Sequence, residues 1–278
     1  MAELVTTAAK LDAWRATIPG KRVAFVPTMG ALHEGHIRLV ERAAEIADAV
    51  VVSIFVNPTQ FGKGEDFERY PRTLENDLAL LGDLADVVYA PSVEDVYPPD
   101  DPPVVTSAGP AGAGFEGASR PGHFDGMLTV VNRLFDIVRP DVAVFGQKDA
   151  QQVFLVKRLA AERGSPEIDV VRTVREDDGL ARSSRNRYLS AEDRAAAVAV
   201  PAAVWAVARD IEAGVSAALA SGRAVLASQP LARLDYLELV SPTDFTPVGE
   251  DFHGVATLVV AARFGNTRLL DTETITVP

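Results

Sequence analysis

The chain contains no cysteine among its 278 residues. This absence excludes disulfide bonds, thiolate catalysis and cysteine-ligated zinc, and it fits a cytoplasmic protein. No apolar run approaches the roughly 18 residues that can cross a bilayer. The first ten residues, MAELVTTAAK, also lack the basic start and apolar core of a secretory signal. We therefore expect a cytoplasmic protein that is neither exported nor inserted in a membrane.

Positive charge is scarce as well: 27 Lys and Arg residues stand against 39 Asp and Glu residues, for a formal net charge of −12. A nucleic-acid partner needs a basic surface that displaces counterions, so the charge disfavours one. No GxGxxG follows the first expected strand, which disfavours a dinucleotide-dependent oxidoreductase. The composition is otherwise that of a globular enzyme, and the length suits two domains.

The most informative stretch is PTMGALHEGH, residues 27–36. The apolar run at 23–26 predicts a strand buried on both faces, and the pattern of residues 35–49 predicts a helix. His33 and His36 are three residues apart, on one face of the first helical turn. Because a helix N-terminus carries unpaired N–H groups and partial positive charge, this arrangement favours phosphate binding. The alternative is that both histidines only cap or pack the helix.

The remaining pattern alternates strands with helices. Further strands are expected at residues 49–56, 85–91, 141–146 and 168–173, and further helices at 3–19, 65–81, 128–138 and 150–162. Residues 97–117, rich in Pro, Gly and Ala, indicate a surface loop or flap. Such alternation predicts a parallel sheet with right-handed crossovers, that is, a Rossmann-like α/β domain.

The composition and pattern of the sequence change after residue 190. Residues 191–228 are Ala-rich and helical with a break near Gly214, and three strands are expected at 234–240, 256–263 and 267–270, the last two joined by a turn at Gly265-Asn266. We therefore predict two domains, residues 1–174 and a smaller C-terminal α+β domain at 175–278.

Several polar residues outside the first turn are candidates for ligand contacts. Gln60 follows the second strand, at the sheet edge where ligands of open parallel sheets bind, although an exposed turn residue is the alternative. Lys148 lies at a strand-to-helix junction where a cation can meet phosphate. Arg120 and His123 could reach a ligand or could form a structural pair.

The stretch RTVREDDGLARSSRNRYLS, residues 172–190, supplies two hydroxyls and a guanidinium on a loop we expect to be mobile. Ser183, Ser184 and Arg185 could grip a triphosphate. The alternative is a basic surface loop whose Ser190 caps the next helix.

Taken together, PTMGALHEGH, FVNPTQF, YPRTLENDL, EGASRPGHF, FGQKDAQQ and DGLARSSRNRYL resemble the pantothenate synthetase (pantoate–beta-alanine ligase) family, within the nucleotidyltransferase superfamily that shares the HxGH signature. The resemblance runs in order from about residue 21 to 189, with LVVAARFGNTRLLD its clearest C-terminal piece. It implies ATP-dependent condensation of (R)-pantoate with beta-alanine through a pantoyl adenylate, with release of AMP and pyrophosphate. It further implies Mg²⁺ and a homodimer.

The resemblance also implies roles for individual residues. Residues 1–174 would bind nucleotide and pantoate, and 175–278 would act as a lid. The ATP-binding residues would be Met29, Gly30, Ala31, Leu32, His33, Glu34, Gly35, His36, Gly146, Gln147, Lys148, Asp149, Val174, Arg182, Ser183, Ser184 and Arg185. The catalytic residues would be His33, His36, Lys148 and Arg185. Pantoate and beta-alanine would contact Gln60, Gln152 and Arg120, and Asp77 would meet Mg²⁺ directly or through water.

Four positions depart from the family pattern: Asn76 replaces a second acid, Arg182 an apolar residue, Ala150 an aromatic and Arg172 a proline. None removes a phosphate-binding group, so activity is expected. Two other functions stay open. One is a related nucleotidyltransferase acting on a phosphorylated acceptor, and the other is a nucleotide-binding protein without catalysis.

Overall fold

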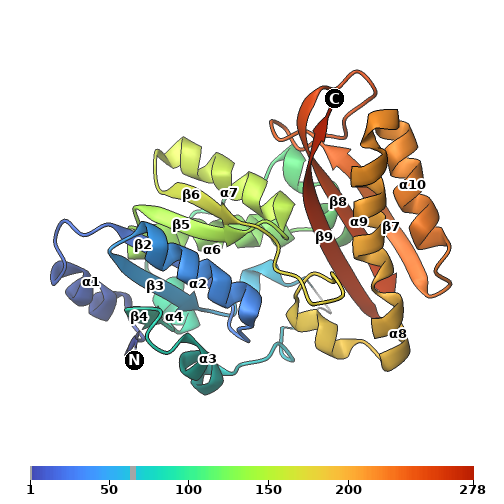
Figure 1. The fold of residues 1–278 in the computed structure, drawn as a ribbon. Helices are drawn as coiled ribbons and strands as arrows, with labels where there is room; N and C mark the ends of the chain where they lie inside the picture. Colours follow the sequence, from blue (N-terminus) through green and yellow to red (C-terminus); the bar gives the residue numbers. More distant parts are fainter. Residues whose placement is uncertain (1, 63–66) are drawn as a thin grey trace. The chain divides into compact units, whose positions relative to one another are not determined.

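The computed structural model describes residues 2–62 and 67–278, and its central element is a six-stranded sheet (Figure 1). The strand order is β1-β4-β3-β2-β5-β6. Neighbouring strands from β1 to β5 run parallel. The strands are β1 (Glu3–Val5), β2 (Val23–Thr28), β3 (Ala49–Ile54), β4 (Val87–Tyr89), β5 (Val142–Gly146) and β6 (Glu167–Val171). The predicted Rossmann-like α/β class is confirmed.

The described residues form two compact units. The first lies within Met1–Phe145 and Leu155–Val171, and the second comprises Gly146–Phe154 and Arg172–Pro278. The division of function that was predicted at residue 174 stays a prediction.

Apolar side chains explain why the middle strands are buried on both faces. Phe25 and Val26 of β2 are fully buried. Val26 belongs to a cluster with Val40 of helix α2 (Glu34–Ile46) and Leu81 of α3 (Leu74–Leu81). Phe25 points to the other side and meets Phe135 of α6 (His123–Val138) edge to face, with ring centroids 6.4 Å apart. Helices thus cover both faces, as a parallel sheet requires.

The first predicted helix, residues 3–19, is wrong in part. Glu3–Val5 form strand β1 and pair with Val87–Tyr89 of β4. The helix α1 (Ala8–Ala16) begins only after Thr7, whose hydroxyl accepts a hydrogen bond from the amide of Lys10. Pairing with a strand more than eighty residues away overrides the local helical pattern.

The helix expected at 65–81 is also shorter than predicted. Residues 65 and 66 lie outside the described part, residues 67–73 are not helical, and α3 begins at Leu74. Pro71 explains the late start, because proline disfavours helical backbone in the preceding residue. Asp77 of this helix is only 2% exposed.

Two other segments differ in extent. The helix expected at 128–138 already begins at His123. The loop expected at 97–117 holds the 3-10 turn η2 (Pro110–Gly112) and the start of α5 (Glu116–Ser119). The remaining helical elements of this part of the chain are η1 (Pro58–Gln60), α4 (Val93–Val96) and α7 (Ala150–Arg163).

The second unit has its own core and sheet. Its antiparallel sheet is ordered β7-β8-β9, and the predicted turn at Gly265-Asn266 joins β8 to β9. The predicted helical break is confirmed at Gly214, which has a φ of +101°. The elements are η3 (Ser184–Tyr188), α8 (Ala191–Ala196), α9 (Ala199–Asp210), η4 (Ile211–Ala213), α10 (Val215–Ala227), β7 (Ala232–Val240), β8 (Gly254–Phe264) and β9 (Thr267–Val277).

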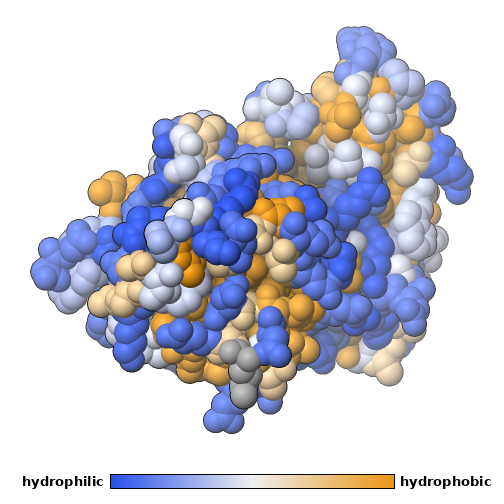
Figure 2. Space-filling view, turned by 60° about the vertical axis from the view of Figure 1, so that its left-hand side comes forward, coloured by the Kyte–Doolittle hydropathy of each residue, from blue (hydrophilic) through white to orange (hydrophobic). Residues whose placement is uncertain are grey.

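Polar residues cover much of the face seen in Figure 2, and apolar residues appear there as separate patches. Val104 and Val105 are the most exposed large apolar residues described, at 81% and 74%. None of the helices in residues 2–62 and 67–278 has the length and apolar content that a membrane crossing needs.

Gly126 offers a test of the packing between α6 and η1. A Cβ atom at Gly126 would lie 2.1 Å from the carbonyl oxygen of Thr59. We expect Gly126→Ala to lower the free energy of unfolding by about 1–3 kcal/mol, the usual cost of overpacking. Denaturant unfolding of the variant and of the unchanged protein measures this difference in free energy. Gly114→Ala is the matched control, because a Cβ there meets nothing within 4 Å, and an equal loss in both variants would contradict this view of the contact.

Candidate active site

The predicted strand, tight turn and helix around His33 and His36 are confirmed. His33 is the N-cap of α2, and its Nδ1 accepts a hydrogen bond from the amide of Gly35 at 3.1 Å. The Nδ1 atom of His36 accepts one from the amide of His33 at 3.3 Å. The two rings lie side by side, with centroids 4.1 Å apart. This is a capping box in which imidazoles replace the usual serine and glutamate.

The capping geometry fixes the tautomer of both rings. An Nδ1 atom that accepts a hydrogen bond carries no proton, so a neutral imidazole must carry its proton on Nε2. Each ring therefore presents an N–H donor at Nε2. The two alternatives posed by the sequence, helix cap and phosphate ligand, are compatible because they use different nitrogen atoms.

The turn before these histidines has an unusual backbone. Gly30 and Ala31 have φ values of +81° and +51°. The amides of Ala31 and Leu32 donate to the carboxylate of Asp77, at 3.0 and 2.8 Å. The Mg²⁺ role implied for Asp77 stays a prediction, and these contacts compete with it.

Gln60 lies in η1, just beyond the end of β3, and is 8% exposed. Its side-chain oxygen accepts from Asn57 Nδ2 at 3.0 Å, and its Nε2 lies 3.0 Å from the sulfur of Met29. Asn57 is itself held by Tyr97, whose hydroxyl donates to Asn57 Oδ1 at 2.7 Å. The amide of Gln60 is therefore set in one orientation by protein groups.

Arg120 and His123 both contact the backbone of Gln60. The Nδ1 atom of His123 lies 2.9 Å from the carbonyl oxygen of Gln60, and Arg120 Nη2 donates to the same oxygen at 3.4 Å. Arg120 Nη1 is 3.1 Å from His123 Nε2. A carbonyl oxygen only accepts, so His123 carries a proton on Nδ1. These contacts agree with the structural alternative for the pair, and the ligand role of Arg120 stays a prediction.

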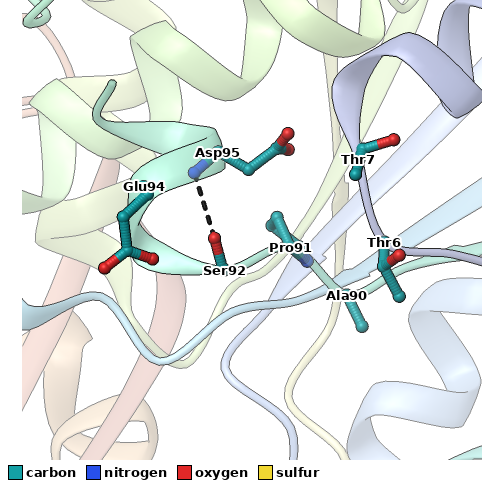
Figure 3. A pocket seen from close by; sticks show the side chains of 7 residues that line it. All are labelled: Thr6, Thr7, Ala90, Pro91, Ser92, Glu94 and Asp95. Atoms are coloured by element: carbon teal, nitrogen blue, oxygen red, sulfur yellow. Dashed lines mark hydrogen bonds between the residues drawn. The ribbon is translucent and has the colours of Figure 1, made fainter. Parts of the chain in front are cut away.

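One cavity of the first unit, of about 720 Å³, lies beyond the ends of β1 and β4 (Figure 3). Asp95 accepts from the amide of Ala8 at 3.0 Å and from the hydroxyl of Tyr89, and burial together with Asp95 raises the pKa of Tyr89. No described residue that lines the cavity is cationic, so it does not suit a phosphate. The lining residues are Thr6, Thr7, Ala90, Pro91, Ser92, Glu94 and Asp95.

A second cavity, of about 330 Å³, lies at the carboxyl ends of β2, β3 and β4 and includes Met29 and Gly30. Arg72 is the one charged residue among those described that line it. Its guanidinium donates to the carbonyl oxygens of Phe67 and Tyr70, both at 3.3 Å. Arg72 thus orders the segment that leads into α3.

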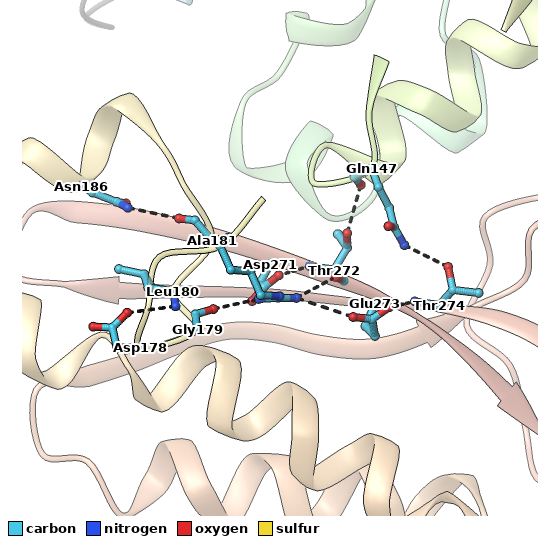
Figure 4. A network of polar contacts seen from close by, with 11 residues as sticks. Gln147, Asp178, Gly179, Leu180, Ala181, Asn186, Asp271, Thr272, Glu273 and Thr274 are labelled. Atoms are coloured by element: carbon cyan, nitrogen blue, oxygen red, sulfur yellow. Dashed lines mark hydrogen bonds and ion pairs between the residues drawn. The ribbon is translucent and has the colours of Figure 1, made fainter. Parts of the chain in front are cut away.

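In the second unit, strand β9 holds the turn that contains Lys148. Thr272 Oγ1 donates to the carbonyl oxygen of Gln147 at 3.0 Å, and Gln147 Nε2 donates to Thr274 Oγ1 at 2.9 Å (Figure 4). The amide of Asp149 donates to Gly146 at 3.3 Å, which closes the turn. The predicted strand-to-helix junction at Lys148 is confirmed, since α7 begins at Ala150.

The same strand anchors the base of the serine-containing loop. Arg175 donates to the buried carboxylate of Asp271 at 2.6 Å and to the carbonyl oxygen of Gly179 at 3.0 Å. Burial raises the pKa of Asp271, while Arg175 and Lys148 oppose this shift. Arg175 also forms an antiparallel bridge with Ala181. The loop is therefore tied to the sheet where it begins.

The far side of this loop is tied by Glu176. Its carboxylate accepts from Asn186 at 2.8 Å and from Arg194 at 2.7 Å. Burial would raise the pKa of Glu176, but these two hydrogen bonds and the charge of Arg194 hold it below the ordinary value. The hydroxyl of Ser183 accepts from the amide of Arg185 at 3.2 Å, and Ser190 caps α8 as one of the two alternatives expected.

Each unit holds part of the predicted site. The first contains Met29, Gly30, Ala31, Leu32, His33, Glu34, Gly35, His36, Gln60, Asp77 and Arg120. The second contains Gly146, Gln147, Lys148, Asp149, Gln152, Val174, Arg182, Ser183, Ser184 and Arg185. In each unit, residues that the sequence did not single out order the segments that carry these site residues. The supporting residues are Asn57, Thr73, Arg175, Glu176, Asp271 and Thr272.

Some of these supporting residues had a local signal. Asn57 precedes a proline, and an Asn side chain at the start of a turn commonly bonds nearby backbone. Asp271 and Thr272 had none, because β9 residues gain their role from contacts more than ninety residues away. Sequence patterns seldom reveal pairs of this kind.

Comparison with known proteins identifies the family of this chain. The pantoate-beta-alanine ligase family matches residues 3–274. A pantothenate synthetase of Leifsonia xyli is 56% identical over 261 residues, which cover 94% of this chain and 91% of that protein. One from Thermobifida fusca is 49% identical over 98% of this chain and 95% of that protein.

Solved structures show the same similarity. The pantothenate synthetase from Thermus thermophilus superposes with a TM-score of 0.90 and 47% identity, covering 98% of both chains. The pantoate-beta-alanine ligase from Francisella tularensis, complexed with beta-gamma ATP and beta-alanine, gives a TM-score of 0.79 and 32% identity over 98% and 97% of the two chains. The match spans nearly the whole sequence, and the chain belongs to the pantoate-beta-alanine ligase family of enzymes.

Proposed function

We propose that this enzyme joins pantoate to beta-alanine in two steps driven by ATP. A carboxylate oxygen of pantoate attacks the α-phosphorus, the bond to the β-phosphate oxygen breaks, and pyrophosphate leaves. The amine of beta-alanine then attacks the acyl carbon of pantoyl adenylate, loses a proton, and expels AMP. No protein nucleophile is needed, which agrees with a chain that has no cysteine. Catalysis depends on alignment and on stabilisation of developing charge.

The observation that carries the proposal is the pair of imidazoles at the start of α2, whose Nδ1 atoms accept hydrogen bonds from backbone amides, within a family match that spans residues 3–274. The Nε2–H groups of His33 and His36 donate hydrogen bonds to phosphate oxygens of ATP. Because their Nδ1 atoms are held by backbone amides, the rings need little reorganisation when negative charge develops on the phosphates. His36 is the main charge-stabilising residue.

The second unit also holds cations and hydroxyls that can bind phosphate. Lys148, Ser183, Ser184 and Arg185 neutralise the phosphates, Gly146–Asp149 and Val174 contact the nucleoside, and Gln60 and Gln152 bind pantoate. Support comes from the anchoring of the Gln147 turn and of the Arg175 loop on β9. A preorganised set of donors loses less entropy when the nucleotide binds.

ATP in such reactions carries Mg²⁺, which would neutralise phosphate charge and usually keeps several waters. Among the described residues, no three His, Asp or Glu side chains are grouped so as to hold a metal ion. Asp77 does not fit a direct ligand, because it is 2% exposed and both its oxygens accept amide protons. We assign no protein ligand to the ion.

A product assay tests the proposed function. We expect the purified protein, given ATP, Mg²⁺, pantoate and beta-alanine, to form pantothenate, AMP and pyrophosphate in equal amounts, measured by mass spectrometry and anion-exchange chromatography. Pantoate alone should support exchange of labelled pyrophosphate into ATP. Formation of ADP and phosphate, or exchange that requires a phosphorylated acceptor, would contradict the proposal.

Replacement of His36 tests its charge-stabilising role. We expect His36→Ala to lower kcat about 10²- to 10³-fold, the usual effect of removing one preorganised donor from developing charge. Pantoate-dependent pyrophosphate exchange should fall by a similar factor, because the first step is affected.

His253→Ala is the matched control for this replacement. His253 is exposed, lies in the second unit, and contacts the carbonyl oxygen of Pro278. We expect its activity to stay within about twofold of the unchanged enzyme, as for most surface substitutions. Undiminished exchange in His36→Ala would refute the assigned role.

A further inference from the structure

The turn between β2 and α2 has a conformation that its own residues do not favour. Gly30 has a φ of +81°, and Ala31, which has a Cβ atom, has a φ of +51°. Left-handed backbone costs an L-residue such as alanine about 1–2 kcal/mol. A compensating interaction must therefore hold Ala31 in place.

The carboxylate of Asp77 supplies that interaction. Its Oδ2 accepts the amide proton of Ala31 at 3.0 Å, and its Oδ1 accepts that of Leu32 at 2.8 Å. The hydroxyl of Thr73 lies 3.2 Å from each oxygen. Hydrogen bonds to an ionised, buried carboxylate are stronger than neutral ones, so two of them on successive amides can offset the strain.

The packing around this carboxylate is close. A Cβ atom at Gly30 would lie 3.0 Å from Asp77 Oδ2 and 3.0 Å from Ile54 Cγ2. A side chain at residue 30 would thus push the turn away from Asp77. The glycine and the aspartate fit one another across 47 residues of sequence.

These bonds also decide which way the peptide groups of the turn face. In a trans peptide the carbonyl points opposite to the N–H. With the amides of Ala31 and Leu32 turned toward Asp77, the carbonyls of Gly30 and Ala31 face the other way. The amide of Gly30 is likewise used, by Thr28 Oγ1 at 3.2 Å. The N–H groups of Gly30, Ala31 and Leu32 are therefore committed inside the protein.

We infer that Asp77 is a positioning residue for the ATP-binding turn, not a metal ligand. Its carboxylate fixes Ala31 and Leu32, and through them the N-cap at which His33 and His36 hold each other. This inference rests on the proposed function for its kinetic consequences. Its structural consequence, the fixed tautomer of two imidazoles, can be measured without substrate.

The decisive variant is Asp77→Asn. An amide has one oxygen, so it can keep only one of the two backbone hydrogen bonds, and its NH₂ group must face the N–H that is left. We expect kcat/KM for ATP to fall roughly 10- to 100-fold, since small displacements of catalytic groups have effects of this size. The Mg²⁺ concentration for half-maximal activity should change less than about twofold, because no metal ligand is lost.

Glu75→Gln is the matched control. It removes the same charge from the same helix turn, but Glu75 is exposed. We expect its kcat/KM and its Mg²⁺ requirement to stay within about twofold of the unchanged enzyme. A loss equal to that of Asp77→Asn would show that charge alone matters and would overturn the inference.

A second measurement separates positioning from metal binding without turnover. In metal-free protein labelled with ¹⁵N-histidine, NMR should show both imidazoles of the turn with the proton on Nε2, and Asp77→Asn should move these signals toward a tautomer mixture. Unchanged imidazole signals, with a Mg²⁺ requirement raised tenfold or more, would establish Asp77 as a ligand. If the enzyme forms no pantothenate, the proposed function fails, while the NMR result still tests Asp77.

Asp77→Asn could also fail to fold, and Thr73→Val covers that outcome. It removes the hydroxyl that contacts the Asp77 carboxylate and leaves both hydrogen bonds from the backbone amides in place. We expect a smaller change of the same kind, a lower kcat/KM for ATP and a partial shift of the imidazole signals with an unchanged Mg²⁺ requirement. A raised Mg²⁺ requirement in Thr73→Val would contradict the inference.

Discussion

The part of the site in the first unit depends on one contact. The carboxylate of Asp77 accepts hydrogen bonds from the amides of Ala31 and Leu32. The chain must turn sharply from β2 into α2, and it does so through two residues with positive φ. Only a strong local acceptor keeps Ala31 in that state. Once the turn is fixed, His33 is placed at the helix start, where its ring can cap the helix with one nitrogen and meet a ligand with the other.

The second unit follows the same physical plan with different groups. There Asp271 of β9 holds Arg175, and Glu176 holds Asn186 and Arg194. These carboxylates hold the two sides of a loop whose hydroxyls and guanidinium are assigned to the phosphates of ATP. Both loops are thus ordered by acidic side chains, of which Asp77 and Asp271 are buried and Glu176 is partly buried, while the groups assigned to the nucleotide are imidazoles, hydroxyls and cations. Under the proposed function, this arrangement would let a chain of net charge −12 bind a polyanion.

The sequence predicted the sheet well because buried parallel strands are continuous apolar runs, as at Val23–Val26. It failed for Glu3–Val5, whose state depends on pairing with a distant strand, and for residues 67–73, where Pro71 delays the helix. It placed His33 and His36 together correctly, because their spacing is local. The burial of Asp77 could not be predicted, since its partners lie 45 and 46 residues away and a pattern of acids along a helix does not show which one is buried.

The central claim is that the carboxylate of pantoate becomes bonded to the α-phosphorus before the amide forms. Isotope transfer tests this directly. Pantoate labelled with ¹⁸O in its carboxylate is converted with ATP and beta-alanine, and the AMP formed is analysed by mass spectrometry. The account predicts one ¹⁸O atom in the phosphate of AMP and none in pyrophosphate, because the bridging oxygen leaves with AMP. Unlabelled AMP, or label in pyrophosphate, would contradict it.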